Sequence, residues 1–146
     1  MTQRKEKTSR TARPRIILAT VHTKDRRPWL ADQMVHMHLR SAWQQALAWR
    51  AGHYIILPDH LYVFAVNAAS RLGPAEWIRY WQSRFNRLHC RPSLRWSSSH
   101  TIRELGPGEG YKHVWSQIRQ QPVRDGLVNK AWEWPYQGEI FQLNVL

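Results

Sequence analysis

Cysteine is nearly absent from this sequence of 146 residues: Cys90 stands alone, which excludes a disulfide framework and any zinc or iron–sulfur site built from several cysteines. Long hydrophobic runs are missing as well. The longest uninterrupted apolar run, residues 61–66, is far shorter than the roughly 20 residues that cross a bilayer, and no apolar segment follows the N-terminus as a secretory signal requires. We therefore expect a protein of a reducing compartment with no membrane partner.

Acidic residues are also few, and their scarcity sets the charge of the protein. Ten Asp and Glu stand against 22 Lys and Arg, which gives a formal net charge of +12. This balance favours a polyanion as the partner, and nucleic acid is the first candidate. Apolar residues still make up 42% of the chain, which is enough to build a buried core and too much for a generally disordered protein.

The chain divides into a short arm and one domain. Residues 1–14 are polar, lack periodicity and carry five basic residues, so they are predicted to form a disordered basic arm that can contact phosphates. Residues 15–146 are long enough for one domain and too short for two well-buried ones.

Apolar periodicity predicts a mixed fold for this domain. Strands are expected at 15–23, 53–57, 61–68 and 94–104. Helices are expected at about 30–50 with Gly52 as the end, after Gly73-Pro74, and around 111–118 with Pro122 as the end, followed by a tail. This order contains the split βαβ unit of the ferredoxin-like α+β fold, an antiparallel sheet with helices packed on one face.

The second predicted helix carries the strongest nucleic-acid signal. At 100° per residue, aromatic and basic side chains gather on one face beside the apolar stripe, namely Trp77, Tyr80, Arg84, Arg87 and Arg91. Arginine binds phosphates in a bidentate manner and aromatic rings stack on unpaired bases, so this face suits single-stranded or distorted DNA or RNA. The alternative is a solvated face whose arginine stems cover apolar neighbours.

Histidine is abundant, with eight residues, but only His60 stands where a metal site would be expected. It follows Pro58-Asp59 at the start of a predicted strand. A histidine two positions further on would point to the same face of the sheet and complete a chelate for a divalent ion. That position holds Tyr62, so the pair is half missing. The G-x-S-x-G, P-loop, H-E-x-x-H and Rossmann patterns do not occur.

Three stretches, taken in order, resemble one known family. They are YIILPDHLYVFAV (54–66), His100-Thr101-Ile102-Arg103, and QPVRDGLVNKAWEWPYQ (121–137). They are similar to the signature elements of the REP-associated tyrosine transposases, which belong to the single-tyrosine, HUH-type transposases. The resemblance covers roughly residues 15–140.

The resemblance implies a ferredoxin-like domain that binds hairpin or single-stranded DNA. In the family, a tyrosine on the last helix attacks a DNA phosphate, and Mg²⁺ or Mn²⁺ held by two histidines polarises that phosphate. Carried over residue by residue, His60 takes the first metal-histidine position, Tyr62 the second, and Gln121 that of a third metal ligand. Gln117 stands at the position of the nucleophilic tyrosine, and an amide cannot form the phosphodiester link.

The resemblance therefore predicts a transposase-like protein with a degenerate active site. We expect it to bind single-stranded or hairpin DNA, to have no catalytic residue and no bound cofactor, and to have lost DNA cleavage and strand transfer. As a bacterial DNA-binding protein it is expected in the cytoplasm, associated with the nucleoid.

Two other functions stay open at this point. A working transposase would need another nucleophile, and Tyr62 or Tyr111 would have to supply it, although Tyr111 lies on an apolar stripe. An RNA-binding module is the second alternative, because the split βαβ sheet also serves RNA recognition, although residues 61–68 lack the aromatic ribonucleoprotein signature. Association into a homodimer also stays open, since residues 61–66 suit either a core strand or an intersubunit edge.

Overall fold

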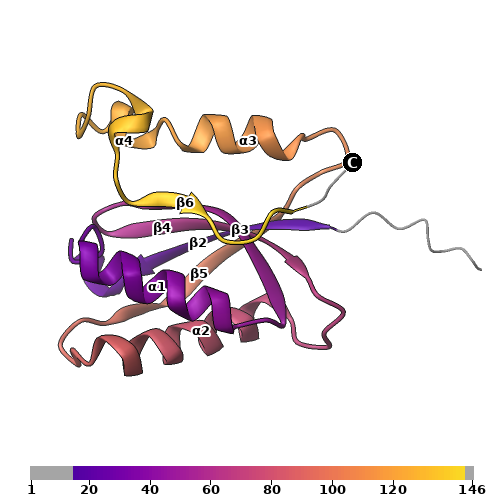
Figure 1. Ribbon diagram of the computed structural model, residues 1–146, viewed down its shortest axis with the longest axis horizontal. Helices are drawn as coiled ribbons and strands as arrows, with labels where there is room; N and C mark the ends of the chain where they lie inside the picture. The colour runs from indigo at the N-terminus through magenta and orange to yellow at the C-terminus, as the bar shows by residue number, and fades with distance from the viewer. Residues whose placement is uncertain (1–14, 144–146) are drawn as a thin grey trace, which may run out of the picture.

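In a computed structural model of the chain, which describes residues 15–143, five strands form one antiparallel sheet in the order β5-β2-β4-β3-β6 (Figure 1). The basic arm expected at residues 1–14 lies outside the described residues. The strands are Ile16–Thr23 (β2), Trp49–Ile56 (β3), His60–Asn67 (β4), Trp96–Glu104 (β5) and Gln137–Glu139 (β6).

Two long helices, Gln33–Gln45 (α1) and Pro74–His89 (α2), connect these strands. The chain order β2-α1-β3-β4-α2-β5, with β2 and β4 between β5 and β3 in the sheet, is the split βαβ arrangement. The predicted α+β class, an antiparallel sheet with helices packed on it, is confirmed. Among the described residues, no helix is both long and apolar enough to cross a membrane.

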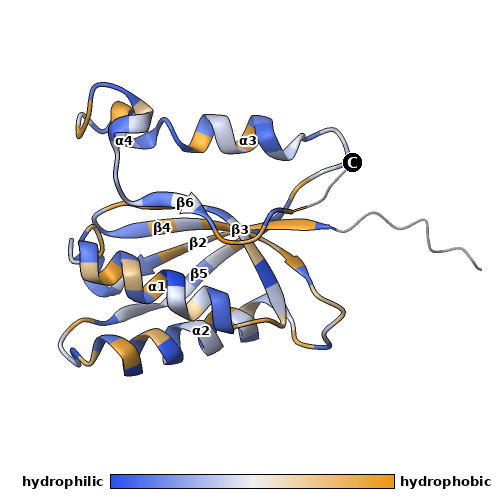
Figure 2. Ribbon diagram, viewed as in Figure 1, coloured by the Kyte–Doolittle hydropathy of each residue, from blue (hydrophilic) through white to orange (hydrophobic). Residues whose placement is uncertain are grey.

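The sheet is covered on both faces, because its side chains alternate between two separate cores. α1 and α2 pack on the first face, whereas the third helix, Tyr111–Ile118 (α3), packs on the second (Figure 1). The two helices of the split βαβ unit share one face, as predicted, whereas the sequence predicted no face for α3. Phe64 and Ile55 present an apolar surface on the second face, and Val114 and Trp115 of α3 bury it. Figure 2 shows hydrophobic and hydrophilic residues interleaved along α2 and α3, as in helices with one buried side.

The apolar run at 61–66 forms most of β4, which pairs with β2 on one side and with β3 on the other. Leu61, Val63 and Ala65 belong to the first core and Phe64 to the second, and all four are fully buried. The run is thus a core strand, which removes the alternative that it forms an intersubunit edge.

The first helix is shorter than predicted. It begins after Asp32, whose carboxylate accepts two of the free backbone N–H groups of the first turn, and it ends at Gln45. Gly52 does not end this helix but lies inside β3. A Cβ there would come within 2.5 Å of the Tyr111 hydroxyl, so glycine is what allows α3 to approach the strand.

The segment after α3 is not a tail. Pro122 does not end α3, which stops at Ile118. The proline lies in the first turn of a short helix, Gln121–Arg124 (α4), where its missing N–H costs nothing. Further on, the indole N–H of Trp134 donates to the carbonyl oxygen of Ile56 at 2.9 Å, and β6 then pairs with β3 as an edge strand. These contacts hold the C-terminal segment against the second face of the sheet.

Candidate functional site

His60 opens β4 and belongs to a hydrogen-bonded chain of three side chains. Its Nδ1 lies 2.7 Å from Oδ1 of Asp59, and Oδ2 of the same carboxylate accepts the Nε–H of Arg26 at 2.9 Å. An ionised carboxylate can only accept, so Nδ1 of His60 donates, and in the neutral imidazole the lone pair is on Nε2. Metal-binding histidines in proteins are oriented by such a hydrogen bond, so His60 is held as the first histidine of a metal site would be.

The negative charge of Asp59 is stabilised by its hydrogen bonds with His60 and Arg26. Burial raises its pKa, but the hydrogen bonds from His60 and Arg26 outweigh burial and leave the pKa below its ordinary value. Each carboxylate oxygen accepts one of these hydrogen bonds, and the lowered pKa keeps Asp59 ionised near neutral pH.

Sequence reasoning missed two residues around His60. His22 lies directly opposite on β2, with the two ring centroids 5.7 Å apart, and burial, then Arg26, then His60 lower its pKa. Strand register would have found His22, since paired residues of an antiparallel sheet point to the same face. Arg26 lies in a short 3₁₀ turn, Lys24–Arg26 (η2), with a left-handed backbone, and no sequence periodicity indicates where it points.

Tyr62 lies on the same face of β4 as His60, as the two-residue spacing predicts. The two rings are 5.3 Å apart and nearly perpendicular. Burial, followed by the charge of Asp125, raises the pKa of the Tyr62 phenol, and Arg26 and Arg124 lower it by less. The phenol therefore stays protonated near neutral pH, and a neutral phenol is a poor ligand for a hard divalent ion.

The two glutamines assigned by the resemblance lie on either side of a helix break. Gln117 is exposed near the end of α3, and its backbone carbonyl oxygen accepts an N–H of Arg124 at 2.8 Å. Gln121 begins α4, and its amide Nε2 donates to Oδ1 of Asp125 at 2.9 Å. The α-helix is interrupted between them, so they do not share one continuous helix face. The Gln121 amide is engaged with its own helix turn.

The residues present do not fit a stable divalent-metal site of the kind that the resemblance implies. Its three ligand positions hold one imidazole, one protonated phenol and one neutral amide, which leaves only the imidazole nitrogen and the amide oxygen as ligands. Across residues 15–143, no group of three or more His, Cys, Asp or Glu is arranged to hold a metal ion. The expectation of no bound cofactor stays a prediction, and these contacts are its physical reason.

Tyr111, the other possible nucleophile, holds α3 against the sheet. Its hydroxyl accepts the backbone N–H of His53 at 2.9 Å and lies 2.8 Å from Nδ1 of the same histidine. Burial is the main cause that raises the pKa of Tyr111 to about 12. A phenol that is buried, doubly hydrogen-bonded and this weakly acidic is a structural residue and a poor nucleophile.

The basic face predicted on α2 is only partly formed. Trp77 is fully buried and its indole N–H donates to the carbonyl oxygen of Ala46 at 2.9 Å, so its placement on an exposed face is wrong. Arg91 lies beyond the helix, which ends at His89.

The three remaining residues of that face do lie together. Tyr80 is 45% exposed, and the guanidinium of Arg84 lies over its ring at 5.8 Å and donates to its hydroxyl at 3.2 Å. Arg84 also donates to Gln45 of α1. Arg87 is exposed and donates to Ser83 at 3.2 Å. The face thus offers one accessible ring and two guanidinium groups, both of which already donate hydrogen bonds to protein oxygens.

Comparison with known proteins gives structural neighbours of this chain. No protein-family model matches the sequence, and no curated protein matches it either. The structure of a REP-associated tyrosine transposase bound to a REP hairpin is similar to this chain with a TM-score of 0.71 and 15% identity, over 97% of this chain and 96% of that one. A putative transposase from Deinococcus radiodurans R1 is similar with a TM-score of 0.54 and 16% identity, over 82% of this chain and 96% of that one. At these identities, the likeness shows that the fold is shared.

Proposed function

With a transposase fold over almost its whole length, we propose that this chain is a DNA-binding protein of the REP-associated tyrosine transposase type that no longer cleaves DNA. The observation that carries the proposal is the 97% coverage by a transposase structure that holds a REP hairpin, because the likeness includes α3 and the C-terminal segment as well as the common α+β sheet. The formal charge of +12 supplies the attraction to phosphates that such binding requires.

The geometry around His60 supports binding without cleavage. Arg26 and Arg124 both act on the pKa of Tyr62, so two positive charges stand beside the centre and attract a phosphate. The position of the nucleophile is held by Gln117, whose amide cannot displace a phosphodiester oxygen. Neither Tyr62 nor Tyr111 replaces it, since burial raises the pKa of both phenols and Tyr111 is bonded to His53.

The alternative of an RNA-binding module is less well supported by the fold. RNA recognition by a split βαβ sheet uses aromatic side chains displayed on the open face of its central strands. Here α3 covers that face: Phe64 of β4 is fully buried, with Tyr111 at 4.9 Å and Trp115 at 6.3 Å between ring centroids. The bases of an RNA strand would have to displace α3 before they could stack.

Two finer expectations accompany the proposal. Binding to chromosomal DNA would place the protein with the nucleoid in a bacterium. Association into a homodimer stays a prediction that light scattering of the purified protein tests directly, because the mass of one chain is 17.4 kDa.

The experiment that tests the proposal is fluorescence anisotropy with three labelled DNAs: a hairpin with a single-stranded flank, the same flank alone, and a plain duplex. The hairpin and the flank should bind more tightly than the duplex, and each phosphate contact should add about −0.7 to −0.9 to the slope of log K against log salt. Binding that does not respond to salt, or no binding at micromolar protein, would refute the proposal.

A further inference from the structure

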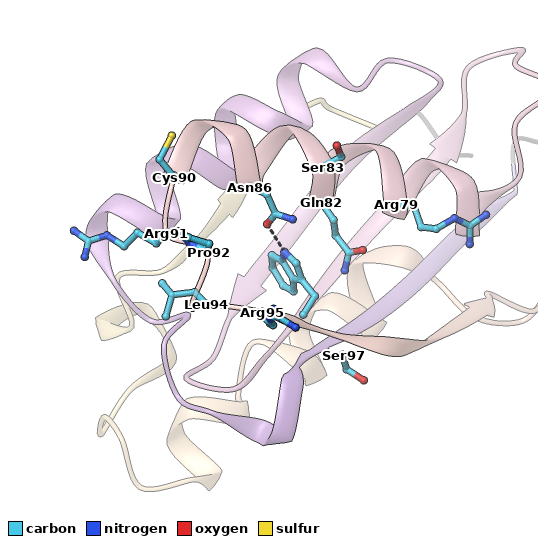
Figure 3. A pocket seen from close by; sticks show the side chains of 11 residues that line it. Arg79, Gln82, Ser83, Asn86, Cys90, Arg91, Pro92, Leu94, Arg95 and Ser97 are labelled. Carbon is cyan, nitrogen blue, oxygen red and sulfur yellow. Dashed lines mark hydrogen bonds between the residues drawn. The ribbon is translucent and has the colours of Figure 1, made fainter.

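A groove of about 660 Å³ lies between α2 and β5, at the opposite edge of the sheet from β6 and away from the face that α3 covers (Figure 3). Arg79 and Arg91 flank its two ends, and Arg95 lies between them below α2 (Figure 3). They come from three different places: the middle of α2, the loop that follows it and the residue before β5. Only Arg91 belongs to the face predicted from the sequence.

The positive charge of this groove is uncompensated. Its lining contains three arginines and no acidic residue, and the single acid between residues 71 and 103, Glu76, accepts a backbone N–H at the start of α2. All three arginines are exposed, and none has an ion pair or a side-chain hydrogen bond with another residue of the range 15–143. By contrast, Arg84 and Arg87 on the neighbouring face already donate to protein oxygens.

The floor and wall of the groove offer contacts that a base could use. Trp96 lines the groove, and its indole N–H donates to Oδ1 of Asn86 at 3.1 Å, which fixes this amide and leaves its N–H₂ group as a donor. Gln82, half-buried on the same side of α2, makes no side-chain hydrogen bond with any described residue. Amides of this kind pair with base edges, while guanidinium groups take the phosphates.

From these contacts we infer that the groove between α2 and β5 is a binding site for an unpaired segment of DNA, with Arg79, Arg91 and Arg95 on the phosphates and Gln82 and Asn86 on the base edges. The inference rests on the proposed function. Its volume lies in the range of sites for small ligands, which fits one or two extruded nucleotides. The site is distinct from the His60 centre, which lies on the face of the sheet that carries the second core.

Cys90 provides a direct probe, because it is the only cysteine of the chain, is exposed and lines the groove. The protein is alkylated with N-ethylmaleimide alone, with a saturating blunt hairpin, and with the same hairpin carrying a single-stranded flank. Anisotropy in the same samples reports how much DNA is bound. The flanked hairpin should slow alkylation of Cys90, and the blunt hairpin should leave its rate unchanged.

Two sets of variants distinguish the contribution of this groove to DNA binding from the contribution of the overall positive charge. Each phosphate contact with a single strand contributes about fivefold to the binding constant at 0.1 M salt, so Arg79→Gln with Arg95→Gln should weaken binding of the flank about 25-fold and reduce the salt slope by about 1.4. Arg50 is an exposed arginine of β3, which is separated from β5 by β2 and β4 in the sheet. The control substitution Arg50→Gln should leave the affinity for the flank unchanged.

The alkylation rate of Cys90 and the affinity for DNA together distinguish a failure of the groove from a failure of the proposed function. If the wild-type protein binds the flanked hairpin, but Cys90 is alkylated equally fast in the complex and the double variant binds as tightly as wild type, the groove is not the site and the proposed function stands. If the wild-type protein binds none of the DNAs, both the groove and the proposed function are wrong.

Discussion

Replacing Tyr62 by histidine should create a divalent-metal site that the wild-type protein lacks. His60 already has Nδ1 fixed by Asp59 and Nε2 free, and the side chain at position 62 leaves the same face of β4, with its ring centre 5.3 Å away. Two imidazoles that share one metal ion have ring centres separated by about this distance, because each nitrogen lies roughly 2.1 Å from the metal. The substitution also removes a bulky phenol whose raised pKa keeps it from ligating.

The size of the effect follows from mass action. At a Mn²⁺ or Co²⁺ concentration about ten times the dissociation constant, binding to the folded state adds about 1.4 kcal/mol to the free energy of unfolding. For a chain of this length, that stabilisation raises Tm by roughly 3–6 °C. Co²⁺ should bind more tightly than Mn²⁺, in keeping with the general order of affinities of divalent metals.

Thermal unfolding followed by circular dichroism, with and without metal, measures this shift. Wild type should show none, and His60→Gln in the Tyr62→His background should abolish it. An equal shift in wild type would mean that Tyr62 or another group already serves as a ligand. A folded Tyr62→His protein without any shift would show that Asp59 does not hold His60 with Nε2 free and directed toward position 62.

Three further outcomes are expected. Burial, and to a smaller extent Arg40, lowers the pKa of His36, whose Nε2 lies 2.6 Å from the Tyr54 hydroxyl, so the unfolded chain binds the proton more readily than the folded one. The free energy of unfolding should therefore be highest above pH 6.5 and should fall as the pH drops from 6.5 toward the lower pKa of the folded state. In His36→Gln this fall should be less steep. Gly52→Ala should destabilise the fold by about 1–3 kcal/mol in urea titration, because its Cβ would lie 2.5–2.6 Å from side chains packed against β3. Trp77→Ala should cost about 3–5 kcal/mol of stability as a core substitution, whereas Tyr80→Ala should keep stability and weaken DNA binding by about 1–3 kcal/mol.

Each of these outcomes can fail in a definite way. A stability that stays flat from pH 7 to 5 would contradict the buried, neutral state of His36. An unchanged urea midpoint for Gly52→Ala would mean that α3 does not press on β3. If Trp77→Ala lost DNA binding while keeping its stability, the sequence-based placement of Trp77 on the binding face would be right after all.

Local patterns in the sequence located most elements of the fold. Gly73-Pro74 marks the start of α2 because proline is favoured in the first turn of a helix, and Tyr111 was correctly placed on an apolar stripe. The spacing of His60 and Tyr62 placed both on one face of a strand, which the structure bears out. These features depend only on residues a few positions apart, which is why the sequence could predict them.

The wrong placement of Trp77 and the features that were not predicted depend on residues that are distant in the sequence. Trp77 lies on the border between the apolar stripe and the basic face. It is buried because Ala46, at the end of α1, accepts its indole N–H and because Trp49 packs against its ring. The placement of α3 on the second face depends on the apolar surface around Phe64. β6 has three residues and no periodicity of its own, so only its pairing with β3 defines it. The groove between α2 and β5 joins arginines that are 16 positions apart in sequence, Arg79 and Arg95, which no helical or strand period connects.

Binding without cleavage can be tested in a single incubation of the wild-type protein with a labelled hairpin that carries a single-stranded flank, in the presence of Mn²⁺. The sample is divided between a native gel, which reports binding, and a denaturing gel, which reports covalent protein–DNA adducts and cut strands. We expect a shifted band on the native gel and neither adduct nor cut strand on the denaturing gel, because Gln117 cannot attack a phosphate. A denaturant-resistant band that maps to Tyr62 or Tyr111 would contradict the loss of cleavage.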